Sequence, residues 1–292
     1  MEILYVIGNG FDLWHGLPTK YTDFYESSGN PLEELKPYLN LDAYKLWNNF
    51  EAVLGKFDCE IFYENHNFID VSGDSFKPSM VYGLEDDLIE QADNLVDGIQ
   101  SQFREWIASI PTEDAKAKFD FKSPRRFISF NYTPTLQAVY GIADDLVFHI
   151  HGSASKYEHL IFGHGESREE EPELDENGDS NRTMFTDAEG AAKYPFYAFQ
   201  KPVNDIIENN LSYFENLKNV EVVVVMGHSL NDIDIPYFEK ISNVIRGRKW
   251  VVSQCSEDEG KSHVRQLGKC GVASDQITLC SIDDIPKMLA SM

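Results

Sequence analysis

The sequence of 292 residues lacks the features that nucleic-acid-binding and membrane-spanning proteins need. Its 25 Lys and Arg residues stand against 49 Asp and Glu residues, a net charge of −24, and the basic residues form no cluster. Binding to the phosphate backbone needs clustered Lys and Arg, so we expect no nucleic-acid partner. The longest strongly apolar run, 222–226, is far shorter than the roughly 20 residues of a membrane-spanning helix, so we expect no membrane partner.

Cysteine pairs are also missing. No two of the four cysteines, Cys59, Cys255, Cys270 and Cys280, have the C-x-x-C spacing, which excludes a zinc module built on such pairs. No basic stretch followed by an apolar one stands near Met1, so we expect a cytoplasmic protein with free thiols.

The composition and pattern that are present favour a folded α/β protein. The chain is 42% hydrophobic and 13% aromatic, far from the composition of a disordered chain. Short apolar segments alternate with segments of helical periodicity, which predicts a Rossmann-type parallel sheet with helices on both faces. The expected strands are 2–7, 126–130, 146–150, 160–162, 220–226, 249–253 and 276–279.

The distribution of helical segments predicts one domain with an insertion. Apolar residues recur at helical spacing over 41–57 and 84–110, and a further helix-like stretch covers 188–217. We expect a single domain over 1–292, with its core in 1–30 and 123–292 and a helical insertion in 31–122 after the first strand and helix. The acidic stretch 166–179 is typical of a solvated loop.

The first candidate site follows the first expected strand. Gly8-Asn9-Gly10 would let the backbone turn sharply and would offer N–H groups to a phosphate, although Leu13 stands where the dinucleotide fingerprint has a third glycine. A plain turn between strand and helix is the alternative. Asp12 either orients a ribose or caps its helix.

Two further sites follow the next strands. Asn131 comes directly after the strand 126–130, where ligands of open α/β sheets bind, or else Asn131 or Thr133 caps the next helix. His149 and His151 share one face if their strand continues. The two histidines are either buried core residues with satisfied hydrogen bonds or members of a functional site at the end of the strand. A metal site of these two with His164 is the third interpretation, but no carboxylate stands at a ligand-like spacing, so no metal is expected.

The fourth site is the segment 227–236, after the most strand-like part of the chain. Gly227-His228-Ser229-Leu230 fits four positions of an esterase nucleophile elbow, with Asp258 and His263 in the order of a catalytic triad. However, Asn231 replaces the last glycine, and Pro236 would interrupt the helix that follows such a serine. The alternative is a loop over a phosphate or ribose, with Asp232 or Asp234 capping a helix.

Together these segments resemble the AbiH-type abortive-infection family, which is associated with bacterial defence against phage. The opening 7–13 with His15-Gly16-Leu17-Pro18-Thr19, and the later blocks 129–133, 149–152 and 227–232, carry the resemblance. The same blocks are similar, more distantly, to the sirtuin-like NAD-binding fold. Thr133 departs from it, because sirtuins carry an Asp there.

The sirtuin-like resemblance implies roles for these residues. It implies that Asn131 contacts the ribose and water and that His151 is catalytic, and it implies NAD binding by the remaining residues of the blocks: Gly8, Asn9, Gly10, Asp12, Gly227, Ser229 and Asp232. Because the zinc module of the deacetylases is missing, an acyl-lysine substrate is not expected. The resemblance implies hydrolysis of NAD, as substrate, to nicotinamide and ADP-ribose.

Other functions remain open at this point. A sensor that binds NAD or ADP-ribose and signals to a partner without hydrolysis is the main alternative, and a serine esterase or a metal-dependent hydrolase are the others. A chain that consumes NAD must be restrained between infections, so a homo-oligomer or a co-encoded defence partner is expected.

Overall fold

The computed structural model describes residues 1–27, 30–39, 50–156, 158–170 and 172–291. It divides into two compact units. The first comprises Met1–Lys20, Ile107–Leu160 and Pro202–Met292, and the second comprises Tyr21–Trp106 and Ile161–Lys201. The single domain and the bounds 31–122 and 166–179 expected from the sequence stay predictions.

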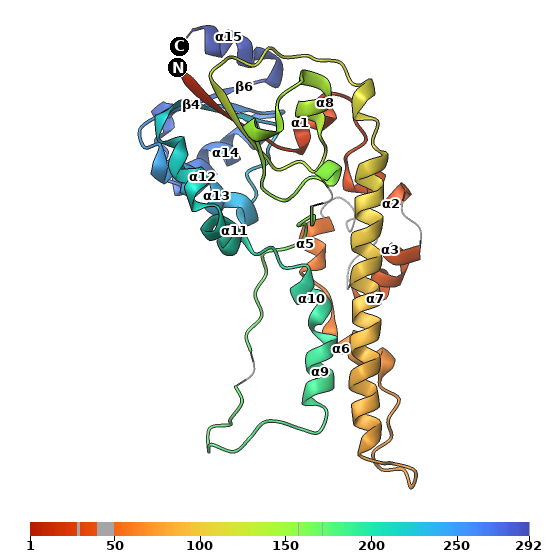
Figure 1. Ribbon diagram of the computed structural model, residues 1–292. Helices are drawn as coiled ribbons and strands as arrows, with labels where there is room; N and C mark the ends of the chain where they lie inside the picture. Colours follow the sequence, from red (N-terminus) through yellow and green to blue (C-terminus); the bar gives the residue numbers. More distant parts are fainter. Residues whose placement is uncertain (28–29, 40–49, 157, 171, 292) are drawn as a thin grey trace. The chain divides into compact units, whose positions relative to one another are not determined.

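The first unit contains a sheet of six parallel strands in the order β3-β2-β1-β4-β5-β6, which confirms the predicted parallel sheet (Figure 1). Apolar and mostly β-branched segments form its centre, as buried strands of parallel sheets require. The strands are β1 (Glu2–Ile7), β2 (Arg125–Ser129), β3 (Val147–His149), β4 (Val220–Met226), β5 (Lys249–Ser253) and β6 (Ile277–Cys280).

Two strand predictions, the continuation of β3 to residue 150 and a strand over 160–162, were wrong. β3 ends at His149, so the chain turns before His151 and the two histidines do not share a strand face. In the described part of the chain, 160–162 is not a strand; Gly163 has φ +138°, and the only bridge there joins His164 to Gln200. An apolar run of three residues has no hydrogen-bonding partner strand to hold it.

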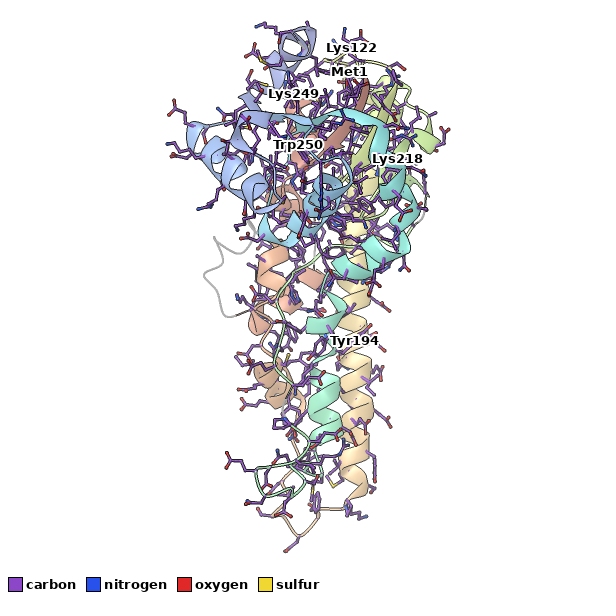
Figure 2. All side chains as sticks on the ribbon, turned by 90° about the vertical axis from the view of Figure 1, so that its left-hand side faces the viewer. Met1, Lys122, Tyr194, Lys218, Lys249 and Trp250 are labelled. Carbon is purple, nitrogen blue, oxygen red and sulfur yellow. The ribbon has the colours of Figure 1, made fainter. Side chains whose placement is uncertain are left out.

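Helices cover both faces of this sheet. On one face, Phe11 of α1 (Asn9–Trp14), Leu136 of α8 (Thr135–Tyr140) and Ile285 of α15 (Ile285–Ala290) join the core formed by alternate strand residues. On the other face, Phe148 packs on Tyr213 with ring centroids 4.5 Å apart. Phe238 lies 6.5 Å from Trp250, the buried side chain that Figure 2 labels. The predicted two-sided covering is confirmed.

Proline residues divide the chain before β4 into several short helices. The stretch 188–217, expected as one helix, is broken because proline lacks an N–H and clashes with the preceding turn. Pro195 lies in the first turn of its helix, and Pro202 precedes the next one. Of the resulting helices, α9 (Thr186–Ala192) and α10 (Tyr194–Ala198) belong to the second unit. The helices α11 (Val203–Asn209), α12 (Leu211–Glu215), α13 (Ile235–Val244) and α14 (Glu257–Lys269) belong to the first.

The second unit is helical with an aromatic core. Phe103 lies at its centre, with ring centroids 4.2 Å from Phe162 and 5.3 Å from Phe24. Residues 41–49 of the helix predicted over 41–57 lie outside the described residues. The helices are α2 (Tyr21–Ser27), α3 (Asn30–Leu35), α5 (Phe50–Leu54), α6 (Cys59–His66) and α7 (Ser79–Ser109, of which residues to Trp106 belong here), followed by α9 and α10. Among the described residues, no helix has the length and apolar character needed to cross a bilayer.

Candidate functional site

The loops after β1 and β4 meet at the point where the strand order reverses. In this strand order, dinucleotides bind in the crevice at that point, beyond the carboxyl ends of the strands. The backbone N–H of Gly10 donates to the carbonyl oxygen of Gly227 across 2.7 Å. A Cβ atom on Gly227, which has φ +67°, would lie 2.2 Å from the backbone nitrogen of Phe11. The glycines therefore allow one loop to lie directly against the other.

This contact uses the N–H groups expected to bind a pyrophosphate. Gly8 donates its N–H to the carbonyl of Met226 at 3.0 Å, and Gly10 donates to Gly227. These two N–H groups are thus already engaged in backbone hydrogen bonds, and nucleotide binding by Gly8 and Gly10 stays a prediction. Asn9 is exposed, and its amide nitrogen donates to the carbonyl of Thr19 at 2.8 Å, which ties down the segment after α1.

Asp12 is a buried carboxyl group bound to the turn after β2. It is 1% exposed, and the Thr133 hydroxyl donates to its Oδ2 at 2.5 Å. The N-cap residue of α1 is Gly8, so the alternative that Asp12 caps this helix is wrong. Burial raises the pKa of Asp12 to about 6, against the lowering effect of Thr133, Thr135 and Asn131. Among the described residues, its Oδ1 has no hydrogen-bond partner.

Asn131 is held by its backbone, and its side chain is left for a ligand. The N-cap residue of α8 is Pro134, so neither Asn131 nor Thr133 caps that helix. The Asn131 N–H donates to Ser129 Oγ at 3.2 Å, and its carbonyl oxygen lies 2.9 Å from His149 Nδ1. The residue is 7% exposed and its side chain lies near enough to Asp12 to lower the pKa of that carboxyl, yet neither carboxamide atom makes a hydrogen bond of normal length and angle with the described residues. A buried amide without partners indicates a site for a polar ligand.

His149 fixes the position of Asn131 and was not assigned this role from the sequence. The amide nitrogen of Gln137 donates to His149 Nε2 at 3.1 Å and to Asp144 Oδ1 at 3.1 Å. His149 Nε2 is therefore an acceptor, and the proton on Nδ1 is donated to the Asn131 carbonyl. Burial lowers the pKa of His149 and favours this neutral form.

His151 lies in a buried aromatic enclosure beside a carboxylate. It is 2% exposed, and its ring centroid lies 5.4 Å from that of Phe130 and 5.7 Å from that of Tyr237. Its Nε2 is 3.9 Å from Asp234 Oδ1, and Asp234 is 7% exposed. Asp234 is the N-cap residue of α13 as predicted, but its side chain makes no cap hydrogen bond.

A second histidine approaches the other oxygen of the same carboxylate. His228 Nε2 lies 3.6 Å from Asp234 Oδ2. Its Nδ1 accepts the N–H of Leu230 at 2.9 Å, so the ring proton is on Nε2 and faces Asp234. The three residues form the cluster His151–Asp234–His228. From the sequence, His228 was predicted only as part of a loop and Asp234 only as a helix cap, because nothing in the spacing places them beside His151.

Ser229 and Asp232 were predicted to bind nucleotide and stay predictions. Both are exposed. The Asp232 carboxylate accepts hydrogen bonds from Gln266 at 2.8 Å and Lys269 at 3.2 Å, and these bonds lower its pKa. The two partners belong to α14, so this carboxylate connects the short helix η7 (Asp232–Asp234) to α14.

The esterase alternative is contradicted by geometry. α13 begins at Ile235 instead of directly after Ser229. The side chain of Asp258 is 93% exposed and pairs with Lys261 at 3.0 Å, whereas His263 is buried and faces Glu259. The triad is not assembled.

The alternative of a metal site with His149, His151 and His164 has no assembled ligand set, because in the described part of the chain no group of three His, Cys, Asp or Glu residues is placed to hold an ion. His164 Nε2 bonds the carbonyl of Phe196 at 2.9 Å, and its Nδ1 accepts the N–H of Glu166 at 3.1 Å. Both ring nitrogens of this predicted ligand are thus already engaged.

The comparisons with known proteins identify a family. Residues 4–254 match the family model described as bacteriophage abortive infection AbiH, which covers most of the chain and all four candidate sites. Neither the curated proteins nor the solved structures contain a match.

Proposed function

Because the chain belongs to the bacteriophage abortive infection family AbiH, its role is in abortive-infection defence against phage, and we propose that it performs this role as an NAD glycohydrolase. In the proposed reaction, water replaces nicotinamide on the ribose and ADP-ribose is the second product. The observation that carries the proposal is the buried carboxamide of Asn131, whose two polar atoms make no hydrogen bond of normal geometry with the described residues. Asn131 follows β2, and His151 follows the adjacent strand β3.

The strand order supports a nucleotide as the ligand. The order β3-β2-β1-β4-β5-β6 has its reversal between β1 and β4, and the residues of the site follow β1, β2, β3 and β4 at one edge of the sheet. Gly10 and Gly227 are in direct backbone contact at the carboxyl ends of the strands, where neither position has room for a side chain. An extended ligand with two ribose and two phosphate groups suits such a crevice.

The proposed reaction needs little acid catalysis by the protein. The bond between ribose C1′ and the nicotinamide nitrogen breaks, and nicotinamide leaves as a neutral group with the bonding electron pair. Water attacks the cationic ribose carbon, and its proton passes to His151. Asn131 orients the water or a ribose hydroxyl, so that the reactants are held in place before the bond breaks.

Asp12 supplies a carboxylate next to Asn131. Sirtuin-like proteins have an Asp at the position of Thr133, and here the Thr133 hydroxyl instead holds the carboxylate of Asp12. Asp12 Oδ1, which lacks a partner among the described residues, accepts a ribose hydroxyl in this proposal. With a pKa of about 6, the group is mostly ionised near pH 7.5 and is able to accept that bond.

The test is incubation of the purified protein with NAD, with nicotinamide and ADP-ribose followed by chromatography. We expect release by the parent and by the exposed loop variant His159→Ala, and none by Asn131→Ala or His151→Ala. Each variant is first shown to be folded by its thermal unfolding. Tight NAD binding in calorimetry without nicotinamide release over hours would replace the hydrolase by a sensor of NAD or ADP-ribose.

A further inference from the structure

The longest helix of the second unit, α7, has an exposed face on which tyrosine and isoleucine side chains lie among carboxylates. We propose that this face, together with the adjacent side of α10, binds a basic segment of a partner protein that carries lysine or arginine among apolar residues. The proposal does not depend on NAD hydrolysis. The surface, named the α7 strip, consists of Tyr82, Asp86, Ile89, Asp93 and Asp97 of α7 and Tyr194 of α10.

The five members of the strip that belong to α7 share one side of this helix. They follow one another at steps of four, three, four and four residues, which is the spacing of neighbours on a helix face. The buried residues of α7, among them Leu84, Leu88 and Leu95, form a separate stripe. From Tyr82 to Asp97 the strip is about 22 Å long, at 1.5 Å per residue.

Three large apolar or aromatic side chains are exposed along the strip. Tyr82 is 70% exposed, Ile89 44% and Tyr194 43%. Burial, followed by the charges of Asp93 and Asp97, raises the pKa of Tyr194, which places this residue of α10 beside the two carboxylates. Figure 2 labels Tyr194 where α10 runs alongside α7. The strip therefore continues from one helix to the next within the second unit.

The positive charge that this surface lacks has to come from another molecule. The second unit contains 28 Asp and Glu residues against 9 Lys and Arg residues, so most of the net charge of −24 belongs to it. From Ser79 to Phe103, α7 contains six Asp and Glu residues and no Lys or Arg. Among the described residues, Asp86, Asp93 and Asp97 form no ion pair.

The same unit shows how a tyrosine and a carboxylate together hold a lysine. Lys36 Nζ lies 4.7 Å from the centre of the Tyr25 ring and 2.5 Å from Glu33 Oε1. A cation above an aromatic ring is attracted by the negative face of the ring. Tyr82 with Asp86, and Tyr194 with Asp93, repeat this combination, and within the described ranges no cation of the chain lies over either ring.

The composition of the strip favours a basic protein segment over other occupants. Exposure to water explains the carboxylates, but it does not explain three large apolar or aromatic side chains on the same face, which are typical of protein interfaces. A second copy of the chain would bring the same excess of negative charge to the surface and would be repelled. A segment with both cations and apolar groups makes use of every member of the strip.

The first test measures the binding of a labelled peptide by fluorescence anisotropy. The peptide has about 15 residues, which matches the strip in helical form, with arginine at every third or fourth position and leucine between. A second peptide has serine in place of leucine and the same charge. We expect the parent to bind the leucine peptide at least about tenfold more tightly, and Tyr82→Ser with Ile89→Ser, which keeps the charge, to lose this preference. A preference that survives in this variant would overturn the proposal.

The second test separates the strip from the general charge of the unit. A variant that removes three charges from the strip should bind the leucine peptide at least about tenfold more weakly, whereas a matched variant that removes three exposed charges from α6 and α9 should stay within about threefold of the parent. Equal losses in the two variants would overturn the proposal. The strip variant combines Asp86→Asn, Asp93→Asn and Asp97→Asn, and the matched variant combines Glu60→Gln, Glu64→Gln and Glu189→Gln.

The parent alone supplies a third test, which holds even where a variant does not fold. A photoreactive group on the leucine peptide should form cross-links within 79–101 and 193–198, located by mass spectrometry. Cross-links concentrated in 166–179 would overturn the proposal. Sedimentation of the parent without peptide should show no self-association through the strip. A dimer that Tyr82→Ser with Ile89→Ser dissociates would assign the strip to a second copy of the chain instead.

Discussion

The hydroxyl of Thr133 donates to the carboxylate of Asp12 with 2.5 Å between Thr133 Oγ1 and Asp12 Oδ2, and so joins the turn after β2 to α1. The bond occupies one carboxylate oxygen and leaves the other without a partner among the described residues. A charged group kept in this buried state destabilises the fold, which is common at functional sites.

Replacing Asp12 should therefore stabilise the protein in a pH-dependent way. Its pKa is raised from 3.8 to about 6, so the folded state binds this proton more tightly than the unfolded state does. The free energy of unfolding then falls as pH rises from about 4 to about 6. We expect Asp12→Asn to raise it at pH 8 by up to about 3 kcal/mol, at 1.36 kcal/mol per pKa unit, and to change it little at pH 3.5.

The measurement is denaturant unfolding of both proteins at the two pH values. The same variant should release nicotinamide more slowly, because Asn lacks the charge that binds a ribose hydroxyl strongly. A variant that is less stable at pH 8 than the parent would show that the carboxylate is structural.

The contact between the loops predicts opposite effects for two glycine substitutions. In Gly227→Ala the new Cβ would meet the backbone of α1, and φ is +67°, so we expect a loss of about 3 kcal/mol or more of unfolding free energy. Gly268→Ala in α14 meets nothing within 4 Å and should gain up to about 1 kcal/mol. Equal thermal stability of the two variants would contradict the loop contact.

The bond from Gln137 to His149 predicts an effect on Asn131 at a distance. Gln137→Met removes the donor that makes His149 Nε2 an acceptor, and the ring becomes free to change its tautomer. We expect the free energy of unfolding to fall by about 1 kcal/mol and nicotinamide release to slow. The ¹⁵N signal of His149 shows whether Nδ1 has lost its proton; an unchanged signal would remove this role from Gln137.

Treatment with a chelator should leave nicotinamide release unchanged. The proposed reaction expels a neutral leaving group, and the histidine expected as a third ligand, His164, has both ring nitrogens in hydrogen bonds. Activity that is lost in chelator and restored by a divalent ion would favour the metal-dependent hydrolase.

Local pattern predicted most of the sheet. The bounds of β1, β4 and β5 match the predicted ones because each is a short apolar run bordered by turn or polar residues. The sequence also offers Asn131 and His151 as candidates, because a polar residue directly after an expected strand is visible in it, and their catalytic roles stay predictions. The N–H groups of Gly8 and Gly10 show what local pattern cannot predict, because their partners are the last residue of β4 and the residue after it, more than 200 positions away in the chain.

The order of the strands depends on contacts between distant segments of the chain. The same contacts decide which side chains meet at the ends of the strands. Composition and periodicity were enough to determine an acidic α/β protein with a parallel sheet, because burial of apolar residues repeats with the period of each element. The pairing of Asp12 with Thr133, the fixed ring of His149 and the position of Asp234 between His151 and His228 came from the folded chain alone. Each joins residues from different strands or loops, and no local spacing records which loops the sheet will bring together.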